Sequence, residues 1–167
     1  MLRVLVAFHA ESSSSEKIAE SFKKAFEAGG HSVEMLGVRA RRKMRVYDYI
    51  KEFRKKKRLE LAPALNDVKS FDLVVVGTPI RRISGTFTPT PEMITYLRGL
   101  KGARNKRFVL FSTCVLTSGS SIKKMSNILT TKGAKIHDTI TVKSIFELDE
   151  KKLLPVRQLA EKISSGL

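Results

Sequence analysis

Hydrophobic residues follow two alternating patterns along the chain, and together these patterns predict an α/β domain. Nearly continuous apolar runs are typical of strands buried on both faces, and the clearest are Leu2–Phe8, Leu73–Gly77 and Phe108–Phe111. Weaker patterns predict further strands at His31–Leu36 and Lys135–Val142. Apolar residues at helical spacing predict the intervening helices. These helices cover Ser14–Ala28, Pro91–Leu100, Ser120–Lys132 and Leu153–Ile163.

The alternation of strands and helices favours a three-layer α/β/α sandwich, in which helices cover both faces of a five-stranded, mostly parallel sheet. Ligands of such sheets bind beyond the carboxyl ends of the strands, where the strand order reverses. Three predicted loops leave carboxyl ends: His9–Ser15, Thr78–Pro91 and Ser112–Gly119. We expect them to border one crevice.

Four consecutive serines, Ser12, Ser13, Ser14 and Ser15, separate the first strand from the first helix. The free amides at a helix start, together with hydroxyl groups, favour an anion such as phosphate. Ser13 and Glu16 also fit a capping box, in which Ser13 bonds the amide of Glu16 and no ligand is needed. The glycine patterns of the familiar phosphate loops are absent, so both interpretations stay open at this point.

Length and composition indicate a globular chain of one domain, residues 1–167. The hydrophobic share is 42%, which is typical of a folded protein. The single cysteine excludes an internal disulfide and favours a reducing compartment. With no signal-peptide pattern and no apolar stretch of membrane-spanning length, we expect a cytoplasmic protein.

Positive charge is in large excess and unevenly placed. Lysine and arginine total 32 against 16 acidic residues, a net charge of +16, which favours anionic partners. Much of it lies in Arg39–Arg58, within an insert at about 39–66 that we expect to carry its own helix. This segment would be either a solvated helix or a docking surface for an acidic redox partner. Nucleic acid is the second choice of partner. The candidate partner-binding residues are Arg41, Arg42, Lys43, Arg54, Lys55, Lys56 and Lys57.

Two segments resemble the flavodoxin-like family of FMN proteins. Flavodoxins carry S/T-x-T-G-N-T between their first strand and helix, and Ser12 and Ser15 match its two threonines. Ser14 takes the place of the asparagine and Ser13 that of the glycine. The stretch Phe71–Ile80, FDLVVVGTPI, is similar to the "YDLVIIGTPIY" third strand of the family.

The resemblance implies strand order 2-1-3-4-5 and an FMN held non-covalently, with a role in electron transfer or flavin-dependent reduction. An FMN-dependent oxidoreductase activity would be one form of this, with no catalytic residue assigned. Arg81 stands where the family often has an aromatic residue, and with Arg82 it would place positive charge beside the flavin ring. The expected cofactor-binding residues are His9, Ser12, Ser13, Ser14, Ser15, Thr78, Pro79, Ile80, Arg81, Gly85, Thr113, Cys114, Val115 and Gly119.

The sequence gives little indication of a redox cysteine or of a metal site. Cys114 ends a predicted buried strand, where a lone cysteine is more often a small hydrophobic residue than a redox group. No spacing of histidine, cysteine and carboxylates predicts a metal site. The alternative to a flavoprotein is a flavin-free interaction module of the same fold, in which the serines only cap a helix.

Overall fold

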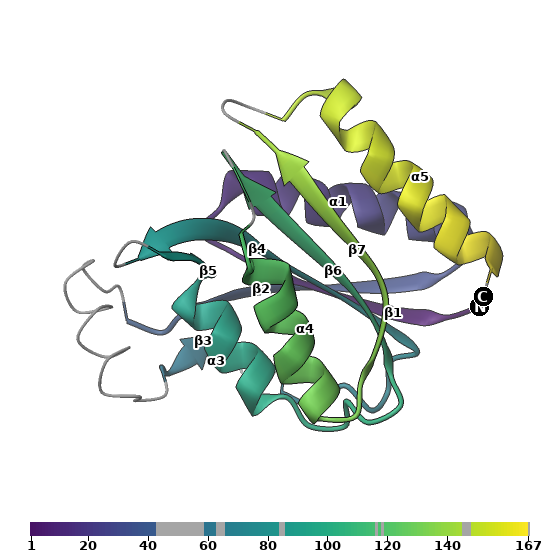
Figure 1. The fold of residues 1–167 in the computed structure, drawn as a ribbon. Helices are drawn as coiled ribbons and strands as arrows, with labels where there is room; N and C mark the ends of the chain where they lie inside the picture. Colours follow the sequence, from purple (N-terminus) through teal and green to yellow (C-terminus); the bar gives the residue numbers. More distant parts are fainter. Residues whose placement is uncertain are drawn as a thin grey trace.

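Five parallel strands form the centre of the sheet in the computed structural model, which describes residues 1–42, 59–62, 66–83, 86–115, 117, 119–144 and 148–166 (Figure 1). They are β1 (Arg3–His9), β2 (Ser32–Ala40), β4 (Leu73–Ile83), β6 (Arg107–Cys114) and β7 (Lys135–Lys143). Their spatial order is β2-β1-β4-β6-β7, and each pairs in parallel with its neighbours. In order of the parallel strands this is 2-1-3-4-5, so the predicted topology is confirmed.

The first strand shows why the apolar runs become central strands. Successive side chains of a strand point to opposite faces of the sheet. Leu5 and Ala7 join the hydrophobic cluster on one face, whereas Val4, Val6 and Phe8 join the cluster on the other. A strand with both faces buried needs this continuous apolar sequence.

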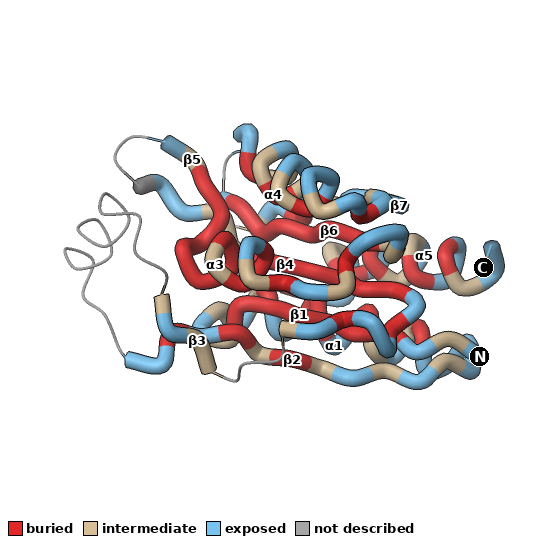
Figure 2. The backbone as a smooth tube through the Cα atoms, turned by 90° about the horizontal axis from the view of Figure 1, so that it is seen from below, coloured by how far each residue is buried: buried red, intermediate tan, exposed pale blue. Residues whose placement is uncertain are grey.

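In the described residues, two helices cover each face of the sheet. The helices α1 (Ser13–Ala28) and α5 (Glu150–Gly166) pack on one face, and α3 (Pro91–Gly99) and α4 (Ser121–Thr131) pack on the other (Figure 1). Figure 2 shows the buried residues concentrated in the central strands and the exposed residues on the outer sides of the helices. The three-layer arrangement is therefore confirmed. None of the helices in the described ranges is long and apolar enough to cross a membrane.

Two short antiparallel strands correct the predicted count of five. β3 (Leu61–Ala62) pairs with the end of β2, and β5 (Thr86–Pro89) pairs with the far end of β4, which gives seven strands in all among the described residues. The predicted loop after residue 78 is thus largely a hairpin. β4 continues past its last pairing with β6, at Pro79, because β5 supplies a new partner from Ile80 onward. Proline is tolerated in β5 because an edge strand leaves one side unpaired.

A close approach between β4 and β6 explains the glycine at residue 77. Gly77 lies opposite Phe111 in the register of these strands. A Cβ atom at Gly77 would lie 1.8 Å from Cζ of Phe111, so any side chain would clash with the ring. The glycine lets Phe111 lie flat over β4 immediately before the strand reaches the candidate site. The predicted helix of the insert falls within residues 43–58, which lie outside the described residues.

Candidate functional site

The carboxyl end of β1 lies beside the middle of β4, at the point where the strand order reverses. From β1 the chain proceeds to β2 on one side of it, and the later strands β4, β6 and β7 follow on the other side. His9 ends β1 and Thr78 lies in the adjacent part of β4, and both are fully buried. In sheets of this kind the reversal point is the usual place of a ligand.

The serine turn begins α1 directly after β1. Ser12 is the N-cap, with an extended backbone (φ −121°, ψ 107°), and its Oγ accepts a hydrogen bond from the Ser15 amide at 3.2 Å. The Ser12 carbonyl accepts from the Glu16 amide at 3.0 Å, so the helix starts here. The capping box of Ser13 and Glu16, one of the two interpretations left open by the sequence, is therefore not formed. Ser13 is already the first helical residue, and a cap must lie outside the helix.

Several hydrogen-bond donors remain available at this turn. The amides of Ser13 and Ser14 precede the first intrahelical bond and have no acceptor within the helix. The Ser12 hydroxyl accepts one bond and keeps its own proton for another acceptor. The Ser15 hydroxyl is completely buried and has no hydrogen-bond partner in the described part of the chain. The turn can therefore receive an anion.

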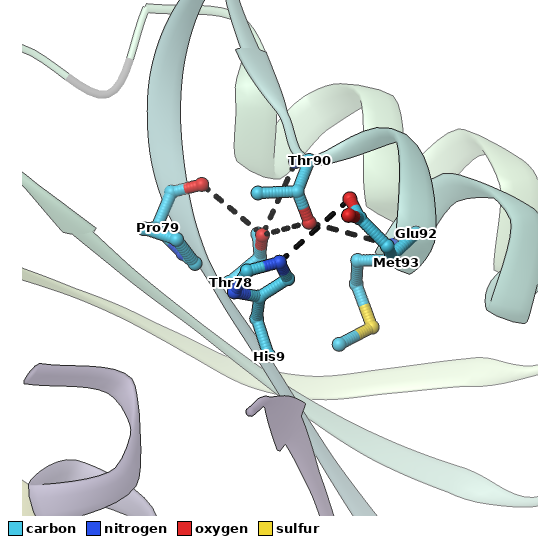
Figure 3. A network of polar contacts seen from close by, with 6 residues as sticks. All are labelled: His9, Thr78, Pro79, Thr90, Glu92 and Met93. Atoms are coloured by element: carbon cyan, nitrogen blue, oxygen red, sulfur yellow. Dashed lines mark hydrogen bonds and ion pairs between the residues drawn. The ribbon is translucent and has the colours of Figure 1, made fainter. Parts of the chain in front are cut away.

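A small network of threonines fixes the middle of β4, where its pairing changes from β6 to β5 (Figure 3). Thr78 Oγ1 accepts from the Thr90 amide at 3.2 Å and donates to the Pro79 carbonyl at 3.1 Å. The hydroxyls of Thr78 and Thr90 lie 3.2 Å apart, and Thr90 caps α3 by accepting from the Met93 amide at 3.4 Å. The network joins β4 to the start of α3. The hydroxyl of Thr78, which we expected at the cofactor, thus has partners within the protein.

His9 faces a carboxylate that the sequence analysis does not single out. Its Nε2 lies 3.7 Å from Oε2 of Glu92, which lies in the first turn of α3, and both side chains are buried (Figure 3). Neither ring nitrogen of His9 has a hydrogen-bond partner among the described residues. Glu11 brings a third ligand atom within 4.8 Å of the other two. Spacing along the chain gives no sign of this cluster, because His9 and Glu92 are 83 positions apart in the sequence.

The end of β6 supplies the other side of the site. Thr113 and Cys114 are buried, whereas Val115 is 56% exposed directly after the strand. Burial raises the pKa of the Cys114 thiol, and the charge of Lys143 opposes this only in part. At neutral pH the thiol is therefore protonated, which agrees with the interpretation of Cys114 as a small hydrophobic residue.

The loop after β6 lies against the hairpin. Gly119 has a φ of +50°, and a Cβ atom there would lie 3.2 Å from Cβ of Phe87 in β5. This contact places the half-buried Phe87, an aromatic residue that sequence reasoning could not position, beside the loop that follows β6. Two of the three predicted loops thus do meet.

The remaining candidate residues are more dispersed. Pro79 and Ile80 are half-buried in β4, and Arg81 and Arg82 follow them as exposed residues of the hairpin. Arg41 and Arg42 are exposed directly after β2. Several predicted site and partner residues lie outside the described residues, namely Gly85, Lys43, Arg54, Lys55, Lys56 and Lys57.

Comparison with solved structures assigns the fold. The chain has the flavodoxin-like fold. Oxidised flavodoxin 1 of Bacillus cereus matches it with a TM-score of 0.70 at 12% identity, over 99% of both chains. A flavoprotein in complex with FMN from Lactobacillus acidophilus matches with a TM-score of 0.61 at 17% identity, over 84% of this chain and 93% of that one.

A larger protein contains a similar unit. The flavodiiron protein of Giardia intestinalis matches with a TM-score of 0.68 at 15% identity, over 98% of this chain but 35% of its own. No protein-family profile matches the sequence, and a search of curated proteins finds no significant match. At these identities the likeness establishes the fold alone.

Proposed function

We propose that this chain binds FMN non-covalently at the carboxyl ends of β1, β4 and β6 and acts in electron transfer or flavin-dependent reduction. The observation that carries the proposal is the serine turn, whose free donors lie at the strand-order reversal of a flavodoxin-like sheet. Flavodoxins and an FMN-bound flavoprotein share this fold, which supports the choice of ligand. When bound, FMN supplies one- and two-electron chemistry at its ring system.

The phosphate end of FMN fits the donors of the serine turn. The amides of Ser13 and Ser14 and the hydroxyl protons of Ser12 and Ser15 would bind phosphate oxygens, and the positive end of the α1 dipole favours the negative charge. A phosphate would also give the buried Ser15 hydroxyl the partner that it lacks among the described residues. Ser13 replaces the family's glycine without distortion, because it is helical here.

The ring end would rest on apolar groups of the neighbouring strands. Val115 is one of three large apolar residues exposed in the described part of the chain, and the other two are Met1 and Leu154. Contact with a flat aromatic ring would bury Val115 together with the half-buried Pro79 and Ile80. Phe87, which lies against Gly119 and is half-buried, offers a stacking surface beside these residues.

The basic residues of the hairpin would affect the reduction potential of the flavin ring. Arg81 and Arg82 are exposed on β4 just beyond Ile80. Successive side chains of a strand point to opposite faces, so one of the two arginines would face the flavin. Its positive charge favours added electrons and would raise the reduction potential of the flavin.

The net charge of +16 supports an acidic protein as the electron-transfer partner. Complementary charge raises the rate of association and makes it sensitive to salt. The exposed Arg41 and Arg42 would contribute to this surface. A redox partner of this kind is consistent with the expected cytoplasmic location.

Titration of FMN against the purified protein, followed by flavin fluorescence, tests the proposal. We expect one FMN per chain, and at least about tenfold weaker binding in a Ser12→Ala, Ser15→Ala double variant, because hydrogen bonds to charged groups contribute about 1.5–3 kcal/mol each. Ser32→Ala is the matched control, since Ser32 is exposed at the amino end of β2. Unchanged FMN affinity with lower thermal stability would mean that the serines only cap α1. Failure of the folded wild-type protein to bind FMN would exclude the proposed cofactor.

A further inference from the structure

The imidazole of His9 is buried without any hydrogen bond among the described residues. Its exposed fraction is 0%, and both Nδ1 and Nε2 lack a partner. A buried polar group without a hydrogen bond loses its hydration and gains nothing in return, so a native protein rarely leaves one without a reason. The ring lies at the end of β1, one turn before α1 begins.

The carboxylate of Glu92 approaches the same ring from the other side of the site (Figure 3). Oε2 of Glu92 lies 3.7 Å from Nε2 of His9, which is longer than a hydrogen bond. The Glu92 side chain is 2% exposed. Carboxylates this deeply buried are generally paired, hydrogen-bonded or bound to a metal ion.

Glu11 completes a set of three ligands. It lies in the turn between β1 and α1 and is exposed, and its carboxylate oxygen comes within 4.8 Å of the ligand atoms of His9 and Glu92. In the described part of the chain, this is the one group of three histidine, cysteine, aspartate or glutamate side chains with such spacing. The set therefore combines one buried nitrogen, one buried carboxylate and one carboxylate open to solvent.

The spacing suits a small divalent cation. Metal–ligand distances of 2.0–2.2 Å in a tetrahedral site separate neighbouring ligand atoms by about 3.4 Å. Relative to the observed 3.7 Å, His9 and Glu92 would move together by a few tenths of an ångström. The Glu11 oxygen, within 4.8 Å of both, would approach by up to about 1.4 Å, which its exposed side chain allows. An imidazole with two carboxylates favours first-row transition metals over Mg²⁺ or Ca²⁺, which prefer all-oxygen ligands.

We propose that His9, Glu11 and Glu92 bind one divalent transition-metal ion such as Zn²⁺, with a water molecule in the remaining position on the solvent side, near Glu11. The site lies between the end of β1 and the start of α3, next to the serine turn. It does not depend on FMN binding. The competing explanation is a buried His9–Glu92 pair in which Glu11 has no part.

Zinc titration by calorimetry separates these explanations, with the protein free of FMN. We expect one Zn²⁺ per chain, and at least about tenfold weaker binding in Glu11→Gln and in Glu92→Gln, since even residues that only support a ligand change metal affinity by 10- to 100-fold. Glu11→Gln is the decisive variant, because Glu11 is exposed and its substitution should leave folding intact. Visible absorption of bound Co²⁺, present in the wild type and lost in Glu11→Gln, would report the same coordination.

Two controls address adventitious binding. Glu16→Gln removes an exposed carboxylate from the same helix start, and His137→Gln removes an exposed histidine from β7, and neither should alter the Zn²⁺ affinity. Absence of stoichiometric Zn²⁺ binding, or equal affinity in Glu11→Gln and Glu16→Gln, would overturn the proposal. The Ser12→Ala, Ser15→Ala variant should keep its Zn²⁺ affinity, so that failure of the FMN site and failure of the metal site are distinguished.

Discussion

Substitution of Gly77 by alanine tests the packing that positions the candidate site. The new Cβ would lie 1.8 Å from Cζ of Phe111 and 2.1 Å from its two Cε atoms. Ordinary carbon contacts begin near 3.5 Å, so the ring would have to withdraw by about 1.7 Å. Phe111 has little room to do so, because it is fully buried and its ring centroid lies 5.8 Å from that of Phe22 in α1.

Gly77→Ala should lower the free energy of unfolding by a large amount for the addition of one methyl group. Overpacking a core typically costs about 1–3 kcal/mol, and the depth of this overlap places Gly77→Ala at the upper end, about 3 kcal/mol. Replacing a strand glycine by alanine would otherwise be favourable by about 0.5–1 kcal/mol. Urea unfolding followed by circular dichroism measures the loss in free energy of unfolding.

A double-mutant cycle assigns the loss to the Phe111 ring. Phe111→Leu should relieve part of the overlap, so that Gly77→Ala costs at least about 1 kcal/mol less in that background. Gly99→Ala, at the end of α3, is the matched control, because the nearest atom to its new Cβ lies at 3.9 Å and stability should not fall. A Gly77→Ala protein as stable as the wild type, or strictly additive effects, would refute this account of the β4–β6 contact.

Three further predictions concern buried polar groups. Thr90→Ala removes the cap of α3 and should lower the free energy of unfolding by about 1–2 kcal/mol, whereas Thr90→Ser, which keeps the hydroxyl, should lower it much less. Equal losses for the two variants in urea unfolding would argue against the cap. Burial raises the pKa of the Tyr96 phenol, so the folded state keeps its proton while the unfolded state ionises above pH 10. Wild-type stability should therefore fall as the pH rises past 10, and urea midpoints of Tyr96→Phe should lack this loss; a parallel fall in both proteins would contradict the assignment. Burial also raises the pKa of the Cys114 thiol, so a thiol reagent should react with the protein at least about tenfold faster after unfolding in urea than in the folded state. Equal rates in the two states would show an accessible thiolate.

The parallel part of the fold could be predicted because its signal is continuous in the sequence. β1 and β6 are apolar on both faces, and this burial pattern specifies central parallel strands. The antiparallel strands were missed for the opposite reason. β3 and β5 have two and four residues, and their pairing depends on the partner strand rather than on a pattern of their own. Pro89 made β5 look like a loop.

The serine turn was predicted correctly as a helix start, but the capping-box interpretation placed the cap one residue too late. Four consecutive serines are chemically equivalent, so the sequence gives no basis for choosing the N-cap among them. The extended backbone of Ser12 identifies it as the cap in the structure. FMN binding there remains a prediction. The approach of Glu92 to His9 could not be predicted, because it depends on which strands are neighbours and on where α3 begins.

Comparison of FMN with riboflavin tests the central claim most directly, since riboflavin lacks only the phosphate. If the serine turn binds that phosphate, the charge-assisted hydrogen bonds from its two amides and two hydroxyls contribute several kcal/mol. The wild-type protein should therefore bind FMN at least about 100-fold more tightly than riboflavin, at about 1.4 kcal/mol per tenfold change. Equal affinity for the two flavins, or binding of neither, would contradict a phosphate site at the start of α1.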